Sequence, residues 1–172
     1  MTKLINDEEL GRHLEENKEL FGEVAFQRWE NPLCKGEIID PDGYLRLTGK
    51  CGESVEIFLK FNGERVHEAS FLTDGCGAVT VCGSFAAEMA MGKTPDEILE
   101  VTGESIIQRL GGFPKEEAHC AFLAAETLQD ALHSYMIKSG SAGGKRAERR
   151  QDSPPFQGRT GSLQDAEPAK GD

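Results

Sequence analysis

The sequence predicts an α+β fold in which three antiparallel strands are followed by helices. Residues 44–48 and 55–61 alternate between apolar and polar positions, which is typical of strands with one buried face. Asn62-Gly63 is a strong two-residue hairpin signal, and residues 65–73 supply the returning strand. After residue 75 the apolar side chains recur every three or four residues, and this spacing indicates helices.

Two helical stretches are predicted ahead of the strands. Asn6, followed by Glu9 three residues later, gives an N-cap pattern, and an amphipathic helix is expected from there toward Phe21. A second short helix is expected over residues 23–29. It should end there because the proline of Asn31-Pro32 disfavours helical backbone at the preceding residue.

The helices after the strands have clear start and stop signals. Thr94-Pro95-Asp96-Glu97 is a capping box with proline at the first helical position, so a short helix should run from here to about Val101. Another should end at Leu110, where Gly111-Gly112 follows. A long amphipathic helix is expected from Ala118 to Lys138.

A chain of 172 residues is long enough for one domain with a hydrophobic core. We assign residues 1–138 to this domain. Residues 139–172 are rich in Gly, Ser and Pro and poor in apolar side chains, so we expect a disordered tail. The N-terminus is charged from the start, and no apolar run approaches the roughly 18 residues of a membrane span. We therefore expect a cytoplasmic protein that does not bind membranes.

The formal net charge of the chain is −11 at pH 7, and the acidic excess lies in the predicted domain. Such a surface disfavours binding to the phosphate backbone of nucleic acids, so no nucleic-acid partner is expected. It favours basic protein partners.

Five cysteines in a cytoplasmic chain indicate metal or thiol chemistry rather than disulfides. Cys82 shares one helical face with Ala78, Phe85 and Met89, so it is predicted to be a core residue.

Three other cysteines lie at the ends of predicted elements, where loops can build a site: Cys51, Cys76 and Cys120. Cys76 is flanked by glycines at a strand-to-helix break, and the start of a helix favours the thiolate. Glu53 should point the same way as Cys51 if their loop is extended. His119 and Cys120 are about 100° apart on one helical turn and could face one point.

Three thiolates, a carboxylate and an imidazole suit a tetrahedral metal site, either for Zn²⁺ or for an iron–sulfur cluster. A [2Fe–2S] cluster requires four protein ligands, and only three here are cysteines. The fourth would be His119, Glu53 or an outside group. Because a harder fourth ligand holds iron less firmly, such a site suits a cluster that is built and handed on.

Several segments resemble the IscU/NifU-type iron–sulfur cluster scaffold family, and the similarity extends from about Phe26 to Lys138. The segments are Glu30-Asn31-Pro32, Cys51-Gly52-Glu53, Asp74-Gly75-Cys76-Gly77-Ala78 and His119-Cys120-Ala121-Phe122-Leu123-Ala124. The resemblance implies an IscU/SufE-like α+β fold with helices packed on the three-stranded sheet. It also implies a non-enzymatic platform where sulfur from a cysteine desulfurase meets iron.

By position, the resemblance makes Cys51, Cys76 and Cys120 cluster ligands and sulfur acceptors, with His119 as an additional ligand. Glu53 occupies the place of the family's aspartate. The implied sequence of events begins with a persulfide, for which Cys120 is the first choice. Iron then joins it, reduction gives a transient [2Fe–2S] cluster, and the cluster passes to an acceptor apoprotein. Gly75 and Gly77 would let the cluster lie close to the backbone.

Other metals and partners are also implied. Zn²⁺ is a metal that such a site takes up in purified protein, and a frataxin-like protein or a chaperone are further partners. The chaperone of the IscU branch reads a Leu-Pro-Pro-Val-Lys segment, where this chain has residues 113–117, Phe-Pro-Lys-Glu-Glu. Cys34 lies outside the family pattern and is expected to be an ordinary exposed thiol.

Three alternatives stay open. The first is a zinc-dependent sulfurtransferase of the SufU type, although that branch carries an insertion between its second and third cysteines that is absent between Cys76 and Cys120. A structural zinc module would usually show closely spaced Cys/His pairs. A Cys–His hydrolase would need an orienting group and an oxyanion motif, neither of which is evident.

Overall fold

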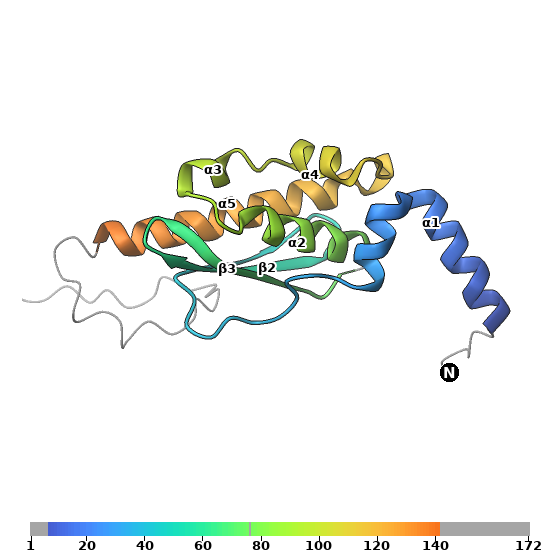
Figure 1. Ribbon diagram of the computed structural model, residues 1–172, viewed down its shortest axis with the longest axis horizontal. Helices are drawn as coiled ribbons and strands as arrows, with labels where there is room; N and C mark the ends of the chain where they lie inside the picture. The colour runs from blue at the N-terminus through green and yellow to red at the C-terminus, as the bar shows by residue number, and fades with distance from the viewer. Residues whose placement is uncertain (1–6, 76, 142–172) are drawn as a thin grey trace, which may run out of the picture.

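The computed structural model describes residues 7–75 and 77–141. These residues form a three-stranded antiparallel sheet with helices packed against it, so the predicted α+β fold is confirmed (Figure 1). No helix in this part of the chain combines the length and the apolar character needed to cross a membrane.

The sheet has the strand order β1-β2-β3, with bounds of Gly43–Thr48, Ser54–Asn62 and Arg65–Thr73. The hairpin between β2 and β3 is present, but its turn lies one residue later than predicted. Asn62 pairs with Arg65, which leaves Gly63 and Glu64 as the loop. Gly63 adopts a φ of +64°, which a glycine tolerates without strain. A register shift between Lys60 and Phe61 adjusts the strands to this turn.

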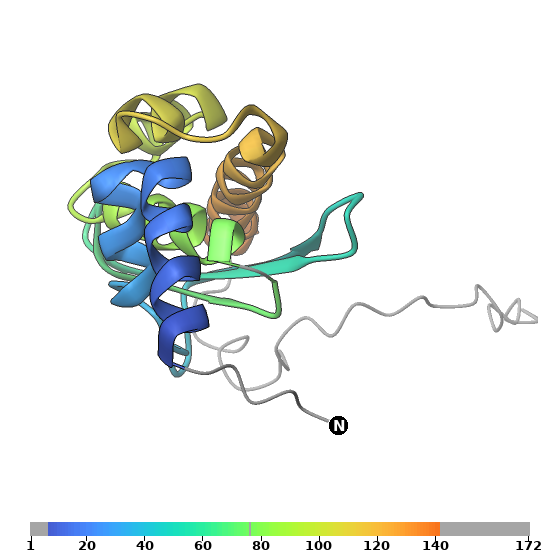
Figure 2. The same cartoon turned by 90° about the vertical axis from the view of Figure 1, so that its right-hand side faces the viewer.

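The N-terminal helix α1 covers Asp7–Glu30 and is interrupted at Gly22, whose φ of 76° and ψ of 165° are not helical. The predicted separation into two helical stretches is therefore confirmed, and Figures 1 and 2 show the change of direction. The predicted N-cap, Asn6, lies outside the described residues.

The later helices are α2 (Gly77–Ala90), α3 (Pro95–Leu99), α4 (Gly103–Leu110), the short 3₁₀ helix η1 (Lys115–Glu117) and α5 (Ala118–Ser141). The predicted capping box at Thr94 is present, and Thr102 forms a second one with Ser105. Gly111 ends α4 in the left-handed region, with a φ of 72°. Helix α5 runs three residues beyond the predicted end of the domain, and the rest of the predicted tail, residues 142–172, lies outside the described residues.

Helices α2 and α5 lie on one face of the sheet, and α3 and α4 lie on the far side of these two helices (Figure 1). The β2 side chains that point into this interior, Val55, Ile57 and Leu59, are fully buried. Cys82 of α2 is also fully buried, as predicted. Burial of each large apolar side chain stabilises the fold by about 1.5–3 kcal/mol, so this layer fixes the positions of the strand and helix ends.

Candidate metal centre

The candidate centre lies where the β1–β2 connection meets the start of α5. The connection, residues 49–53, carries Cys51, which is exposed, and Glu53, which is half-buried. The Cys51 Sγ lies 3.6 Å from Glu53 Oε2, so the two side chains face the same space. Gly52 between them has a φ of +85°, a conformation that glycine adopts without strain.

His119 in the first turn of α5 is held in an orientation suited to metal binding. Its Nδ1 lies 2.9 Å from the backbone carbonyl oxygen of Glu116. Because a carbonyl oxygen only accepts hydrogen bonds, Nδ1 carries the proton, and Nε2 of the neutral ring offers its lone pair. Metal-binding histidines are generally fixed in this way, by a bond from the second ring nitrogen. The Nε2 atom lies 3.5 Å from Cys120 Sγ.

Two groups of potential ligands share His119. In one, the ligand atoms of Cys51, Glu53 and His119 all lie within 4.8 Å of one another. In the other, those of Glu117, His119 and Cys120 meet the same limit. The structure thus brings together four of the five residues singled out in the sequence. Cys76, the fifth, lies outside the described residues.

The segment that leads to Cys76 is close to the same centre. A Cβ atom placed on Gly75 would lie 3.1 Å from Glu53 Cβ and from Glu53 Cδ. The β3–α2 connection therefore runs directly against the Glu53 side chain. At Gly77, a Cβ atom would lie 2.4 Å from Nε1 of Trp29. The Cβ positions of these two glycines are thus occupied by protein side chains, which by itself favours glycine there. The close approach of a cluster to this backbone stays a prediction.

Side chains tie the two cysteine-bearing connections to one another. The carboxylate of Asp74 accepts a hydrogen bond of 2.7 Å from the backbone N–H of Ser54. The Thr73 hydroxyl donates to the Ser54 carbonyl oxygen at 2.7 Å and accepts from the Gly75 amide at 2.9 Å. Arg46 forms a further ion pair with Asp74, at 3.0 Å. Residues next to Glu53 and residues next to Cys76 are therefore held in one hydrogen-bonded unit.

Cys120 is fully buried, which the sequence did not predict for a residue at a helix end. Helix α5 packs its first turn against the core, so the thiol faces inward. Its Sγ lies 3.6 Å from Oε2 of Glu117 as well as close to His119. Glu117 was not singled out in the sequence, although its position three residues before Cys120 places both on one helical face.

Cys34 also differs from expectation. It is half-buried against the core, and not exposed as predicted. Burial raises the pKa of the Cys34 thiol, and the Glu88 carboxylate raises it further, whereas Arg28 acts in the opposite direction. Arg28 and Glu88 form a bidentate ion pair with distances of 2.6 and 2.8 Å. These two charged residues belong to α1 and α2: Arg28 lies six residues before Cys34, and Glu88 lies 54 residues after it.

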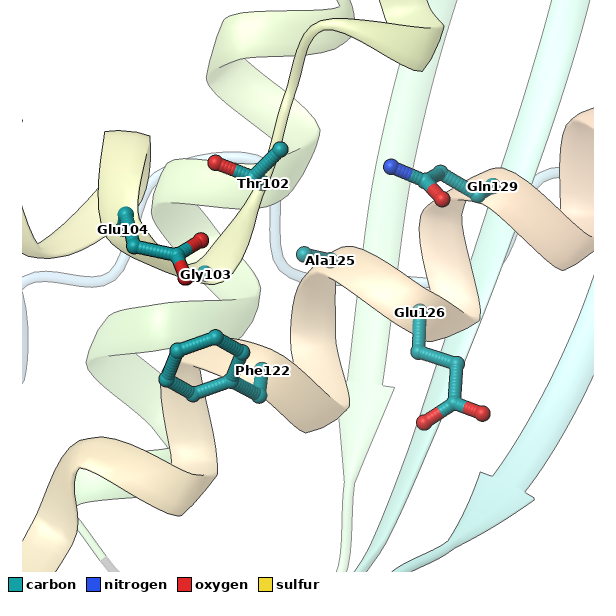
Figure 3. Close-up of a pocket in the computed structure, with 7 residues that line it drawn as sticks. All are labelled: Thr102, Gly103, Glu104, Phe122, Ala125, Glu126 and Gln129. Atoms are coloured by element: carbon teal, nitrogen blue, oxygen red, sulfur yellow. The ribbon is translucent and has the colours of Figure 1, made fainter.

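A groove of about 750 Å³ opens beside the centre, with Cys51 and His119 in its wall. Phe122 separates it from a smaller hollow of about 240 Å³ between α4 and α5. Figure 3 shows the Phe122 ring near Gly103, at the start of α4, and Glu126 pointing away from it. A Cβ atom on Gly103 would lie 2.5 Å from Phe122 Cδ1, so the ring fits there because the residue is glycine. The exposed thiol thus borders an open, partly apolar groove.

Comparison with known proteins identifies the family of this chain. Residues 20–142 match the family described as the NifU-like N terminal domain. The chain belongs to this family. The expected relation to the IscU/NifU-type scaffolds is confirmed by this match together with sequence relatives that are IscU proteins.

Three relatives illustrate the relation. The chain is 36% identical over 122 residues to iron–sulfur cluster assembly scaffold protein IscU 1 of Archaeoglobus fulgidus, covering 70% of this chain and 80% of that protein. It is 31% identical over 123 residues to the IscU scaffold protein of Aquifex aeolicus, covering 70% and 78%. For nitrogen fixation protein NifU of Azospirillum brasilense the identity is 37% over 110 residues, and the match covers 61% of this chain but 36% of that protein.

Solved structures show the same fold at low sequence identity. A NifU-like N-terminal protein from Brucella abortus superposes with a TM-score of 0.57 at 16% identity, covering 71% of this chain and 98% of that one. A candidate iron–sulfur cluster assembly scaffold protein of the SUF system from Fervidobacterium islandicum gives 0.53 at 18% identity, covering 67% and 98%. These two similarities concern the fold alone.

Proposed function

We propose that this protein is a cytoplasmic scaffold for iron–sulfur cluster assembly. It accepts sulfur as a persulfide from a cysteine desulfurase and binds iron, and an external electron donor reduces the persulfide sulfur to sulfide. A transient [2Fe–2S] cluster then forms and is transferred to acceptor apoproteins. The observation that carries the proposal is the meeting of Cys51 and Glu53, from the β1–β2 connection, with His119, from the first turn of α5, in a chain of the NifU-like family. The cluster is cargo in this proposal, and the protein has no catalytic residue of its own.

The ligands in this proposal are Cys51, Cys76 and Cys120, with His119 or Glu53 in the fourth position. The donor set fits iron because it combines soft sulfur with imidazole nitrogen and carboxylate oxygen. The exposure of Cys51 and His119 leaves the centre accessible to a partner protein. A cluster bound at such an edge can be transferred without unfolding the core.

Sulfur transfer to this site requires attack by a thiolate on the outer sulfur of the desulfurase persulfide. A new S–S bond forms to the scaffold cysteine, the S–S bond within the donor breaks, and the desulfurase thiolate leaves. Cys51 can be reached directly, whereas Cys120 becomes reachable only when the first turn of α5 moves away from the core. Mapping the persulfide by mass spectrometry decides between the two.

The experiment that tests the function is anaerobic reconstitution with ferrous iron, cysteine, a cysteine desulfurase and a thiol reductant that converts persulfide to sulfide, followed by absorption and Mössbauer spectroscopy. Ser variants of Cys51, Cys76 and Cys120 should each lose most of the cluster signal. Cys34→Ser and Cys82→Ser are matched controls, because these thiols lie outside the centre, and both should keep it. Wild-type cluster formation in all three site variants would overturn the assignment.

The alternative of a zinc-dependent sulfurtransferase gains little support, because the likeness to a SUF-system protein concerns the fold alone. Tight stoichiometric zinc binding, together with sulfur transfer in the absence of any cluster, would favour it over the scaffold.

A further inference from the structure

Glu117 occupies a position that the proposed ligand set does not use. It is the last residue of η1, its side chain is half-buried, and its carboxylate faces the Cys120 thiol at the beginning of α5. We propose that Glu117 is a metal ligand. With His119 and Cys120 it forms a three-donor site for a single divalent ion, which is Fe²⁺ during cluster assembly. This inference rests on the proposed function, because it concerns how the iron cargo is held.

The distances from Cys120 to the other two donors match those around a bound metal, and all three ligand atoms lie within 4.8 Å of one another. Bond lengths of about 2.3 Å to sulfur and about 2.0–2.2 Å to nitrogen or oxygen, at the tetrahedral angle, separate two donor atoms by about 3.5–3.7 Å. The Cys120 Sγ lies 3.6 Å from Glu117 Oε2 and 3.5 Å from His119 Nε2. An ion could therefore enter with little rearrangement of these side chains, once it has replaced the thiol proton.

The local backbone fixes the orientation of the donor side chains. The hydrogen bond between His119 Nδ1 and the Glu116 carbonyl directs Nε2 toward the other donors. Glu117 and Cys120 are three residues apart across the η1–α5 junction, so both side chains lie on one face of this short helical segment. The site is therefore built within four consecutive residues and does not need the β1–β2 connection.

His119 also belongs to the group that contains Cys51 and Glu53. Since Nδ1 is engaged by the backbone, only Nε2 is available, and it can bind one ion at a time. The two groups are thus alternative positions for one ion on either side of the same ring. An ion bound first by Glu117 and Cys120 can move to the exposed side, where Cys51 and Glu53 replace those ligands.

The test isolates the Glu117 group in a variant that carries Cys51→Ser, Glu53→Gln and Cys76→Ser. Of the proposed ligands this variant keeps only Glu117, His119 and Cys120. Anaerobic titration with Co²⁺, followed by calorimetry and by the thiolate-to-cobalt absorption band, should show one bound ion per chain. Adding Glu117→Gln should weaken binding by about tenfold or more and reduce the band, since loss of even a supporting residue costs about 10–100-fold.

Glu116→Gln is the matched control. Glu116 is the exposed neighbour of Glu117, and it contributes only its backbone carbonyl to His119, which the substitution preserves. Binding in this variant should stay within about twofold of its parent. Circular dichroism checks that each protein is folded. Glu117→His supplies an imidazole nitrogen in place of the lost carboxylate oxygen. It should recover part of the affinity if Glu117→Gln acts by removing a ligand.

Two results would overturn the inference: no Co²⁺ binding in the folded parent variant, or equal affinity with and without Glu117→Gln. Cluster reconstitution in the wild-type protein separates this failure from that of the scaffold function. If the wild type builds a cluster while the parent variant binds no Co²⁺, only the role of Glu117 is wrong. If Glu117-dependent binding is found and the wild type builds no cluster, the scaffold proposal fails instead.

Discussion

The carboxylate of Asp74 accepts a hydrogen bond from the backbone N–H of Ser54 at 2.7 Å. Ser54 directly follows Glu53, and Asp74 lies two residues before Cys76, so this bond joins the two cysteine-bearing connections. The hydroxyl of the adjacent Thr73 donates a hydrogen bond to the backbone carbonyl oxygen of the same Ser54. The backbone N–H and C=O of Ser54 are thus both bonded by side chains at the end of β3, Asp74 and Thr73. These bonds extend the contact between β2 and β3 past their last paired residues, Val55 and Thr73.

Replacement of Asp74 by Ala should therefore disturb the centre more than it disturbs the fold. The variant loses the carboxylate-to-amide bond and the exposed ion pair with Arg46, of which the second contributes little. Its free energy of unfolding should therefore fall by about 1–2 kcal/mol, measured by urea denaturation. Because the bond also fixes the spacing between the connections, the variant should bind Co²⁺ or Fe²⁺ about tenfold more weakly. Calorimetric titration under anaerobic conditions measures the second effect.

Asp42 provides the control at the opposite end of β2. Its carboxylate accepts a similar bond of 2.8 Å from the Phe61 amide, far from the cysteines. Asp42→Ala should reduce stability by a comparable amount and leave metal affinity unchanged. Equal effects of the two substitutions on metal affinity would show that Asp74 acts only through global stability.

Gly77 should tolerate no side chain. A methyl group there would lie 2.4 Å from Nε1 and 2.6 Å from Cδ1 of Trp29, which is too close for any real contact. Gly77→Ala should thus lower the free energy of unfolding by about 1–3 kcal/mol, as expected for overpacking. Urea denaturation provides the measurement.

Two further variants show whether the Trp29 contact is the cause. Gly112→Ala is the control, because nothing lies within 4 Å of the added methyl group and its φ is not left-handed. Its stability should remain near that of the wild type. Combining Gly77→Ala with Trp29→Leu should recover part of the loss in a double-mutant cycle, and strictly additive effects would contradict the proposed clash.

Thiol modification should distinguish Cys34 from Cys51. Burial and the Glu88 carboxylate raise the pKa of Cys34, so its reaction with iodoacetamide at pH 8 should be slow, and should accelerate only above the usual thiol range. The raised pKa also sets a sign for stability. The folded state holds the Cys34 proton more tightly than the unfolded state does. The protonated thiol therefore contributes fully to the free energy of unfolding below the ordinary thiol pKa, and this contribution is lost as pH rises through the raised pKa.

Glu88→Gln separates charge from burial in this prediction. Without the carboxylate, Arg28 remains beside Cys34 and favours the thiolate, so alkylation at pH 8 should become about threefold faster or more. Peptide mass spectrometry follows each cysteine in the same sample. Cys51, which lies in the β1–β2 connection beside Glu53, should react at an unchanged rate. A slow Cys34 in both proteins would mean that burial alone controls its reactivity.

Local patterns in the sequence predicted most of the fold. The strands, the break near Gly22, the capping box at Thr94 and the start of α5 all depend on residues within one turn or one hairpin. The burial of Cys82 followed from its place on a helical stripe. The hairpin was displaced by one residue because the register of β2 and β3 is fixed by their buried face, which overrides the preference of Asn62-Gly63 for the loop.

The parts that escaped prediction depend on residues far apart in the chain. The carboxylate that acts on Cys34 belongs to Glu88, 54 positions later, and the neighbour of Gly77 is Trp29, 48 positions earlier. The burial of Cys120 depends on how α5 meets the core, which a helix-end pattern does not report. Glu117 is different, because its three-residue spacing from Cys120 is a local pattern that the sequence itself contains.

Trp29 is the only tryptophan in the chain, and its indole ring rests on the first residue of α2, next to Cys76 in the sequence. The tryptophan emission of the protein, excited selectively over that of its two tyrosines, therefore comes from one ring next to the segment that carries Cys76. A metal ion or a coloured cluster arriving there would quench or shift that emission without any added label. The fold thus contains an optical reporter with which loading and release could be followed in real time.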